Sequence, residues 1–160
     1  MRLNNRNRAG LYNFISTAIL LLFALGFGAF FMELFKFDFL GKGITALLII
    51  IPVILGLIFF LRGRQIFEYD SDGEALNFKN RNILLYEKPI SDEFPKYKLA
   101  SYEIIDALIF RKLFINVSSK KNKVITLKYD VAYLNQKELK DLKFSLNKVI
   151  KENQEIKREN

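Results

Sequence analysis

The stretch FEYDSDGEALNF (67–78) decides how the second half of the chain folds. Its acidic centre has two interpretations, half of a cation-binding loop or the turn of a β-hairpin. The pair Asp72-Gly73 is favoured in a two-residue type I′ turn, because both central positions of that turn require positive φ. With this turn Tyr69 lies opposite Leu76, and apolar residues alternate with polar ones along both strands, as in a half-buried antiparallel pair.

The cation-binding interpretation fails on the spacing of the ligands. A calcium loop needs oxygen ligands at fixed positions and a closing bidentate Glu about 12 residues along the loop. Leu76 and Phe78 occupy positions where that loop would need oxygen atoms. The sequence therefore predicts a hairpin turn here, and we expect neither a metal site nor a cofactor.

Composition excludes several classes of catalysis. The chain of 160 residues contains no Cys, no His and no Trp. A thiol nucleophile, a Ser-His-Asp triad and the usual zinc sites are therefore impossible within this chain. Two carboxylate clusters remain, Asp70 with Asp72 and Glu74, and Asp92 with Glu93, and both lie in predicted turns, where solvated acids are usual and perturbed pKa values are not. We expect the protein not to be an enzyme.

Charge divides the chain into two parts. Residues 1–61 contain five basic and two acidic side chains, whereas residues 62–160 contain twenty basic and fifteen acidic ones. The first part is mostly hydrocarbon, and the second has the composition of a soluble domain with a basic excess. That excess is diluted by acids and falls short of the basic footprint of a nucleic-acid-binding domain. We therefore expect no nucleic-acid partner.

Two apolar runs predict a transmembrane hairpin over residues 1–61. Residues 11–32 are uncharged, and so are the eighteen residues 44–61. A membrane-spanning helix needs about 20 mostly apolar residues, so we predict helices at about 11–35 and 44–61, joined by the linker 36–43. The first run is longer than that of a signal peptide and lacks a small-x-small cleavage pattern, which favours a retained anchor.

Basic residues flank the predicted hairpin at its two outer ends. Arg2, Arg6 and Arg8 precede the first helix, and Arg62 and Arg64 follow the second. The linker has two lysines, and two acids lie close to them. By the positive-inside rule both termini lie in the cytoplasm and the linker lies outside.

Several residues within the hairpin are candidates for helix packing. Ala24 and Gly28 form a small-xxx-small pair that would let the two helices, or two protomers, approach closely. Pro52 frees one backbone carbonyl and predicts a kink, and Gly56 adds a further small residue. Glu33 lies at the exit of the first helix and is interpreted as an interfacial carboxylate, because a proton relay would prefer the bilayer centre.

The region after the first hairpin contains a predicted strand and a predicted loop. Residues 82–87 have apolar side chains on both faces, which is typical of a central strand. Residues 88–96 contain Pro89 and Pro95, and we predict a loop there.

The next strands are predicted from alternation. Residues 98–110 are strand-like, but their apolar phase slips at Ile104-Ile105, and a bulge or bend there would reconcile the two halves. The stretches 113–119 and 123–129 flank KKN as a second hairpin.

The chain then changes to a helical period. Asn135 and Glu138 form a capping box, and we predict an amphipathic helix over about 135–152 that lays an apolar stripe on the sheet. Residues 154–160 continue no stripe, so we predict a frayed, charged tail. The stripe consists of Leu139, Leu142, Leu146, Val149 and Ile150.

This order of elements resembles the small bacterial membrane proteins that carry a pleckstrin-homology-like (PH-like) domain. The likeness rests on the hairpin at 62–80, the stretch 95–105 that enters a middle strand, and the closing helix at 134–150. The resemblance implies an α+β fold, with about seven short antiparallel strands and one helix forming a PH-like domain over 62–153. It also implies a multi-pass protein of the bacterial inner membrane, and a binding or assembly module without catalytic residues.

The expected function is therefore a non-enzymatic interaction or assembly module at the cytoplasmic face of the membrane. Its expected partners are the lipid bilayer and a protein partner or further copies of the chain. Sheet edges and the predicted 88–96 loop are candidate contact surfaces.

Two alternatives remain open. One is an accessory subunit of a larger membrane complex. The other is a domain that senses anionic lipid surfaces, since each basic residue near such a surface contributes about 1 kcal/mol. The candidate membrane-surface contacts are Arg111, Lys112, Lys120, Lys121 and Lys123.

Overall fold

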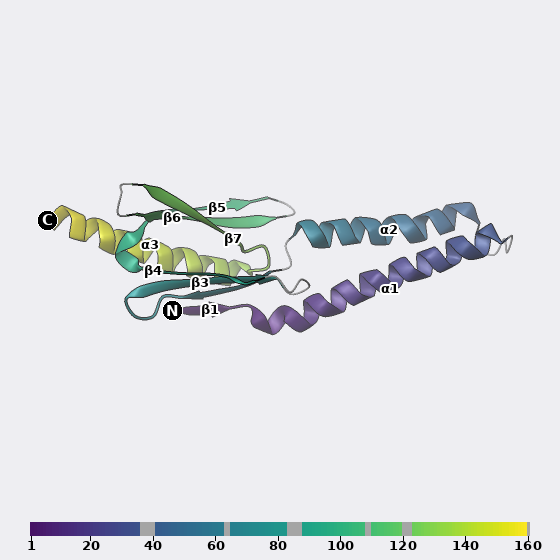
Figure 1. Ribbon diagram of the computed structural model, residues 1–160, viewed down its shortest axis with the longest axis horizontal. Coiled ribbons are helices and arrows are strands. Elements are labelled where there is room, and N and C mark those ends of the chain that lie inside the picture. The colour runs from purple at the N-terminus through teal and green to yellow at the C-terminus, as the bar shows by residue number, and fades with distance from the viewer. Residues whose placement is uncertain (36–40, 63–64, 83–87, 108–109, 120–122, 160) are drawn as a thin grey trace. The chain divides into compact units, whose positions relative to one another are not determined.

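The computed structural model describes residues 1–35, 41–62, 65–82, 88–107, 110–119 and 123–159 (Figure 1). The chain divides into two compact units. One consists of Met1–Ala9 together with Arg62–Asn160 and is called the β unit here. The other consists of Gly10–Leu61 and is called the helical unit.

The helical unit is an antiparallel pair of apolar helices. Helix α1 spans Ala9–Leu34 and helix α2 spans Lys42–Leu61. Two stretches, Arg6–Leu34 and Gly43–Leu61, are long and apolar enough to cross a membrane, and only 6% and 11% of their most apolar windows are buried. Their apolar side chains thus face outward, unlike those of a core helix in a soluble protein. The two predicted apolar helices are confirmed.

Helices α1 and α2 approach each other closely at Gly26. A Cβ atom there would clash with the carbonyl oxygen of Leu48, so only glycine permits this contact. The predicted pair, Ala24 and Gly28, is exposed. Each lies two residues from Gly26, about 200° around the helix, and therefore on its opposite side. Within the hairpin this pair does not mediate packing, which leaves only the alternative of contact between protomers.

Pro52 and Gly56 lie on the side of α2 that faces α1. Pro52 is buried, and a Cβ atom at Gly56 would lie 3.7 Å from the side chain of Ile19, an ordinary van der Waals distance. The proline occurs inside a continuous helix, where it removes one backbone hydrogen bond.

The β unit is built from two antiparallel sheets. The first has the order β1-β2-β3-β4, and the second has the order β5-β6-β7. The strands and short 3₁₀ helices of the described residues are β1 (Arg2–Asn4), η1 (Arg6–Arg8), β2 (Gln65–Asp70), β3 (Ala75–Asn82), β4 (Ile90–Pro95), η2 (Lys96–Lys98), β5 (Leu99–Asp106), β6 (Arg111–Ser118) and β7 (Val124–Asp130).

Strand β1 precedes the helical unit and pairs with the strand that follows it. Arg2 lies opposite Asp70, and Asn4 opposite Glu68, so the apolar hairpin is an insertion between two neighbouring strands of one sheet. Leu3 lies in the core of the β unit. Sequence analysis did not find β1, because three residues with one apolar side chain carry no measurable periodicity.

The turn after β2 is longer than predicted. Tyr69 pairs with Phe78, two residues beyond its predicted partner. The Asp70 carboxylate accepts a hydrogen bond from the backbone N–H of Asp72 (2.9 Å), and Gly73 has φ of 74°, so this loop is stabilised locally. Because side chains alternate between the two faces of a strand, a shift by two residues leaves each side chain on its predicted face. The predicted apolar residues therefore remain in the core.

The predicted 88–96 loop is wrong, because Ile90–Pro95 form β4. This strand pairs with β3, and Phe94 lies opposite Leu76. Strand β4 is the edge of its sheet and needs ladder hydrogen bonds on one side only, so prolines at its ends are tolerated. Of the predicted strand 82–87, Asn82 ends β3 and the other residues lie outside the described part of the chain.

The second sheet follows the predicted alternation with one correction. The β6–β7 hairpin is confirmed, with Ser118 opposite Val124. In β5 the register shifts between Leu99 and Ser101 instead of at Ile104-Ile105. The apparent slip in the sequence arises because Ile105 is an apolar residue on the exposed face.

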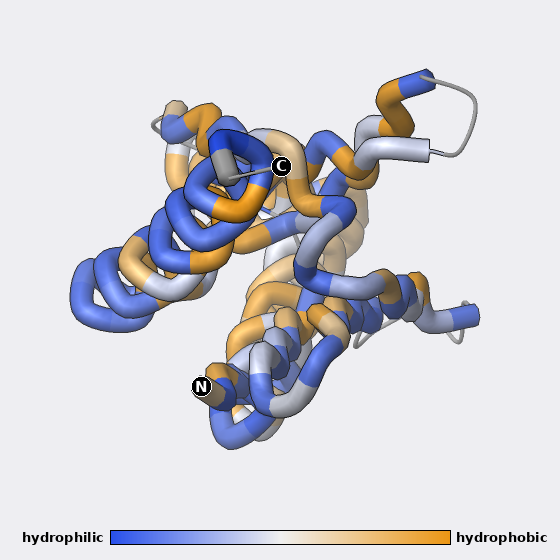
Figure 2. Tube along the Cα trace, turned by 90° about the vertical axis from the view of Figure 1, so that its left-hand side faces the viewer, coloured by the Kyte–Doolittle hydropathy of each residue, from blue (hydrophilic) through white to orange (hydrophobic). Residues whose placement is uncertain are grey.

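Helix α3 (Gln136–Glu159) closes the unit, and its capping box is confirmed. Asn135 and Glu138 each accept a backbone N–H of the other residue at 2.7 Å. The helix continues seven residues past its predicted end near 152, through the region predicted to fray. Asn153 explains this extension, because its amide donates to the carbonyls of Lys96 and Leu99. Figure 2 shows hydrophilic and hydrophobic residues alternating along α3.

The core lies between the two sheets and α3 (Figure 1). Phe78 stacks on Phe94 of its own sheet and on Tyr129 of the other, with ring centroids 5.7 and 5.0 Å away. The Tyr129 hydroxyl donates to Asp92 at 2.7 Å, and burial raises the pKa of Tyr129 far above its ordinary value. Aromatic stacking thus joins the two sheets.

Asn80 makes a second connection between the sheets. Its amide donates to the carbonyls of Ile66 (3.3 Å) and Asp130 (3.2 Å) and accepts the N–H of Asp130 (3.0 Å). The residue is only 3% exposed. Buried polar groups need such partners, because an unsatisfied one costs about 1–3 kcal/mol.

Replacing Asn80 should therefore destabilise the β unit strongly. Asn80→Ala leaves the Asp130 N–H and C=O without this partner, and we expect a loss of about 2–3 kcal/mol in the free energy of unfolding. The matched control is Asn116→Ala, which removes two side-chain bonds on the solvent face of β6 and should cost less than about 1 kcal/mol. Denaturant unfolding of the full chain in micelles measures both, and equal losses would contradict the proposed role of Asn80.

Candidate membrane-proximal surface

The β unit connects to the helical unit at two points near the start of α3. The chain leaves the β unit after Ala9 and returns at Arg62. Arg62 lies over the ring of Tyr133, with its guanidinium carbon 5.6 Å from the ring centroid. Arg8 donates to the carbonyl of Tyr133 and to both oxygens of Glu138 (2.9 and 3.1 Å). One end of the β unit thus carries both connections.

Glu138 has two roles at this end. Its carboxylate completes the capping box of α3, and both of its oxygens accept from one guanidinium nitrogen of Arg8. A carboxylate is favourable in the first turn of a helix, where the backbone N–H groups carry partial positive charge. Arg8, which sequence analysis interpreted as an orientation signal, is therefore also an internal tie between the N-terminal segment and α3.

Arg111 is engaged inside the β unit. Its guanidinium contacts Asp106 at 2.7 Å and donates to the carbonyl of Leu134 at 3.1 Å. The side chain is 15% exposed, and the Arg111 guanidinium holds the pKa of Asp106 below its ordinary value. Arg111, predicted as a membrane-surface contact, thus has its charge neutralised within the fold.

The predicted basic contacts that the structure describes do not form one patch. Lys112 lies beside Arg111, with its ammonium 5.6 Å from the ring centroid of Phe110. Lys123 is exposed at the opposite end of the β6–β7 hairpin, about 20 Å away along the strands. Lys120 and Lys121 lie outside the described residues.

Sequence analysis missed one exposed aromatic side chain on α3. Phe144 is 73% exposed, and helical spacing places Lys140 and Lys148 on either side of it. The only available signal was an aromatic residue outside the apolar stripe.

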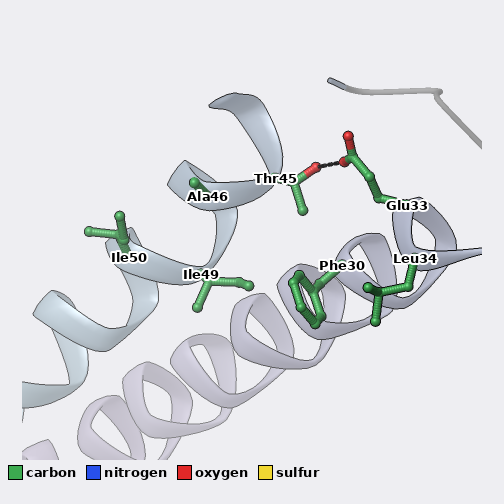
Figure 3. A pocket seen from close by; sticks show the side chains of 7 residues that line it. All are labelled: Phe30, Glu33, Leu34, Thr45, Ala46, Ile49 and Ile50. Atoms are coloured by element: carbon green, nitrogen blue, oxygen red, sulfur yellow. Dashed lines mark hydrogen bonds between the residues drawn. The ribbon is translucent and has the colours of Figure 1, made fainter. Parts of the chain in front are cut away.

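The helical unit contains an apolar groove of about 440 Å³ near the turn of the hairpin (Figure 3). The Thr45 hydroxyl donates to the Glu33 carboxylate, which links α2 to α1, and also contacts the Gly41 carbonyl at 3.2 Å. The other Glu33 oxygen has no partner among the described residues. Glu33 thus stabilises the end of the hairpin. The groove is lined by Phe30, Glu33, Leu34, Thr45, Ala46, Ile49 and Ile50.

A smaller polar hollow of about 300 Å³ lies over β1, β2 and β3. Its charges are arranged in cross-strand pairs, since Arg2 lies opposite Asp70 and contacts it at 3.0 Å, and Glu68 lies opposite Lys79. Within the described residues, no group of three potential metal-ligating side chains occurs here or elsewhere. The hollow is thus a surface of paired charges.

Comparison with known proteins gives no relative for this chain. No family model, curated protein or solved structure matches it.

The Asp106–Arg111 pair predicts a specific dependence of stability on pH. Because the pKa of Asp106 is lowered in the folded state, its contribution is present above the pKa of the unfolded chain and is lost as pH falls through the folded value. Asp106→Asn should therefore destabilise the protein at pH 7 and be neutral near pH 2. Urea unfolding of the full chain, followed by tyrosine circular dichroism, measures the difference. Asp141→Asn, at an exposed position on α3, is the control; a penalty for Asp106→Asn that persists at acid pH would contradict this assignment.

Proposed function

We propose that this protein is a membrane-anchored, non-enzymatic interaction or assembly module that displays a PH-like domain at the cytoplasmic face of a bacterial inner membrane. The observation that carries the proposal is the insertion of an apolar helical hairpin between β1 and β2 of one folded unit. Both ends of the hairpin return to the same domain, as expected of a domain that is held at one membrane surface.

The order of elements supports the PH-like assignment. Among the described residues, four strands form one antiparallel sheet, the next three form a second, and a single amphipathic helix follows. Residues of both sheets and α3 share one core. The resemblance implies about seven strands after the hairpin; the described residues have six strands there and one strand, β1, before it.

The flanking charges support the cytoplasmic orientation. Arg6 and Arg8 precede the first apolar helix and Arg62 follows the second, which by the positive-inside rule favours the cytoplasm for both ends. The pairing of β1 with β2 requires residues 2–4 and 68–70 to lie on one side of the membrane. An even number of membrane crossings meets both requirements.

Among the described residues, the basic side chains that were predicted to contact lipid favour a protein partner over a lipid headgroup. Arg111 is paired with Asp106, and Lys112 and Lys123 lie at opposite ends of one hairpin. A lipid-sensing surface would gain most from several free basic residues gathered at one end.

Cysteine accessibility tests the orientation, and the natural absence of cysteine makes single-cysteine variants clean. In intact cells an impermeant maleimide should label Gly43→Cys, near the hairpin turn, but neither Asn7→Cys nor Lys151→Cys. Permeabilisation should expose both of these. Labelling of Asn7→Cys and Lys151→Cys from opposite sides would contradict the β1–β2 pairing, and labelling of both in intact cells would reverse the proposed orientation.

Copurification tests the function. The full chain, isolated from its native membrane in mild detergent, should carry a protein partner or further copies of itself in a fixed stoichiometry. A monomeric, partner-free preparation that binds anionic vesicles in a salt-dependent manner would instead favour the lipid-sensing alternative.

A further inference from the structure

Along β7, the backbone N–H and C=O groups of successive residues point alternately toward the neighbouring strand β6 and toward the outer edge of the sheet. At one end of the hairpin Ser119 donates to the carbonyl of Lys123 (2.8 Å), and at the other Val131 donates to the carbonyl of Arg111 (3.0 Å). In an antiparallel ladder such hydrogen-bonded residues recur at every second position. The odd-numbered residues of β7 therefore bond to β6, and the even-numbered ones direct their N–H and C=O groups outward.

Asn80 marks where this outward edge ends. Its side chain accepts the N–H and binds the C=O of Asp130, the last even-numbered residue of β7. The three preceding even-numbered residues have no backbone partner on this side among the described residues. They are Val124, Thr126 and Lys128. The fold thus caps one end of the edge and leaves three consecutive outward positions open.

The other sheet edges are shorter or protected. Strand β1 has only three residues, and β4 is bounded by Pro89 and Pro95. Strand β5 is covered by α3 at its first residue, where Asn153 donates to the carbonyl of Leu99. Proline, short length, coverage and charged side chains, lysine above all, are the usual means by which edges are protected from pairing. Strand β7 has seven residues and no proline, and its charged protection consists of Lys123 and Lys128, which oppose a basic or identical strand but not an acidic one.

The exposed side chains along this edge indicate which residue types a strand that pairs with β7 would need. Val124 and Ile125 are 62% and 52% exposed, and these β-branched residues offer apolar contacts to a neighbouring strand. Lys123 and Lys128 are also exposed and favour carboxylates on the strand that pairs with them. An extended segment in which apolar residues alternate with acidic ones would form hydrogen bonds with the outward backbone groups of β7. Its apolar side chains would contact Val124 and Ile125, and its carboxylates would pair with the lysines.

A second copy of the chain fits this edge poorly. Antiparallel pairing of two β7 strands would place the Asp130 end of one beside the Val124 end of the other. The Asp130 end lies near the connections to the hairpin, since Arg111 joins Val131 to Leu134 and Arg62 contacts Tyr133. A second copy would bring lysines instead of carboxylates to Lys123 and Lys128, because residues 123–129 contain no acidic side chain.

We propose that β7 is a docking edge for an extended segment of a different protein, in which apolar and acidic residues alternate and which adds a fourth strand to the β5-β6-β7 sheet. This is β-strand addition, where backbone hydrogen bonds give affinity and alternate side chains give specificity. The inference rests on the proposed function as an interaction module and names the edge and the chemistry of the partner.

A designed peptide tests the edge directly. The probe is a fluorescent peptide of alternating valine and glutamate, whose own charges oppose self-association at neutral pH. It should bind the full chain in nanodiscs, and hydrogen exchange should slow at the amides of Val124, Thr126 and Lys128. Thr126→Pro removes one outward N–H without touching the β6 ladder, and should weaken binding about tenfold or more.

The matched control is Thr126→Val, which removes the same hydroxyl bond to Asn116 but keeps the backbone N–H. It should bind the peptide within about twofold of the natural chain. A second variant pair tests charge without a proline. Lys123→Glu with Lys128→Glu should weaken the glutamate peptide and favour a valine–lysine peptide, whereas Lys148→Glu on α3 should change neither.

The outcomes separate this inference from the proposed function. Equal binding by Thr126→Pro and Thr126→Val, or exchange protection at another edge, would overturn the β7 assignment. A copurified partner that stays bound to both variants would leave the interaction module intact while refuting this docking edge. Absence of any partner would refute the proposed function itself.

Discussion

The pairing of β1 with β2 is the constraint on which the rest of the structure depends. Three residues on the N-terminal side of the apolar hairpin complete a sheet whose other strands all lie on its C-terminal side. The ion pair between Arg8 and Glu138 strengthens this arrangement, because it binds the same segment to the capped start of α3. The hairpin is thereby an insertion within the domain, and the domain has two covalent connections to it instead of one flexible tether.

Sequence patterns were sufficient where a period extended over many residues. The two apolar helices, the β6–β7 hairpin and the Asn135–Glu138 cap all follow from spacing and composition. Sequence patterns gave wrong predictions where a structure depends on a contact with a residue that is distant in the sequence. Pro89 and Pro95 indicated a loop, because the sequence does not reveal that β4 is an edge. Gly26 was overlooked in favour of a common spacing motif, since only the packing with Leu48 shows which face of α1 meets α2.

The sequence predicts which residues of the candidate surfaces are charged, but not whether those charges are free to bind a partner or are already paired within the fold. Arg111 and Lys112 are adjacent in sequence, yet one is paired with Asp106 and the other lies over Phe110. The free edge of β7 was not predictable, because it depends on a hydrogen-bond parity set by β6 and on Asn80, a residue fifty positions away. Availability of a charge or a backbone group is a property of the tertiary structure.

The separation of β1 from β2 has a consequence for biosynthesis. At a synthesis rate of about 5–20 residues per second, the ribosome needs several seconds after making Leu3 to produce its partner Tyr69. Both apolar helices emerge during that interval. The first sheet therefore gains its β1 edge strand only once the helices have been made, and only if both strands have come to the same side of the bilayer. In the topology proposed above, completion of the first sheet would therefore report that the hairpin had inserted with both of its ends on one side of the membrane.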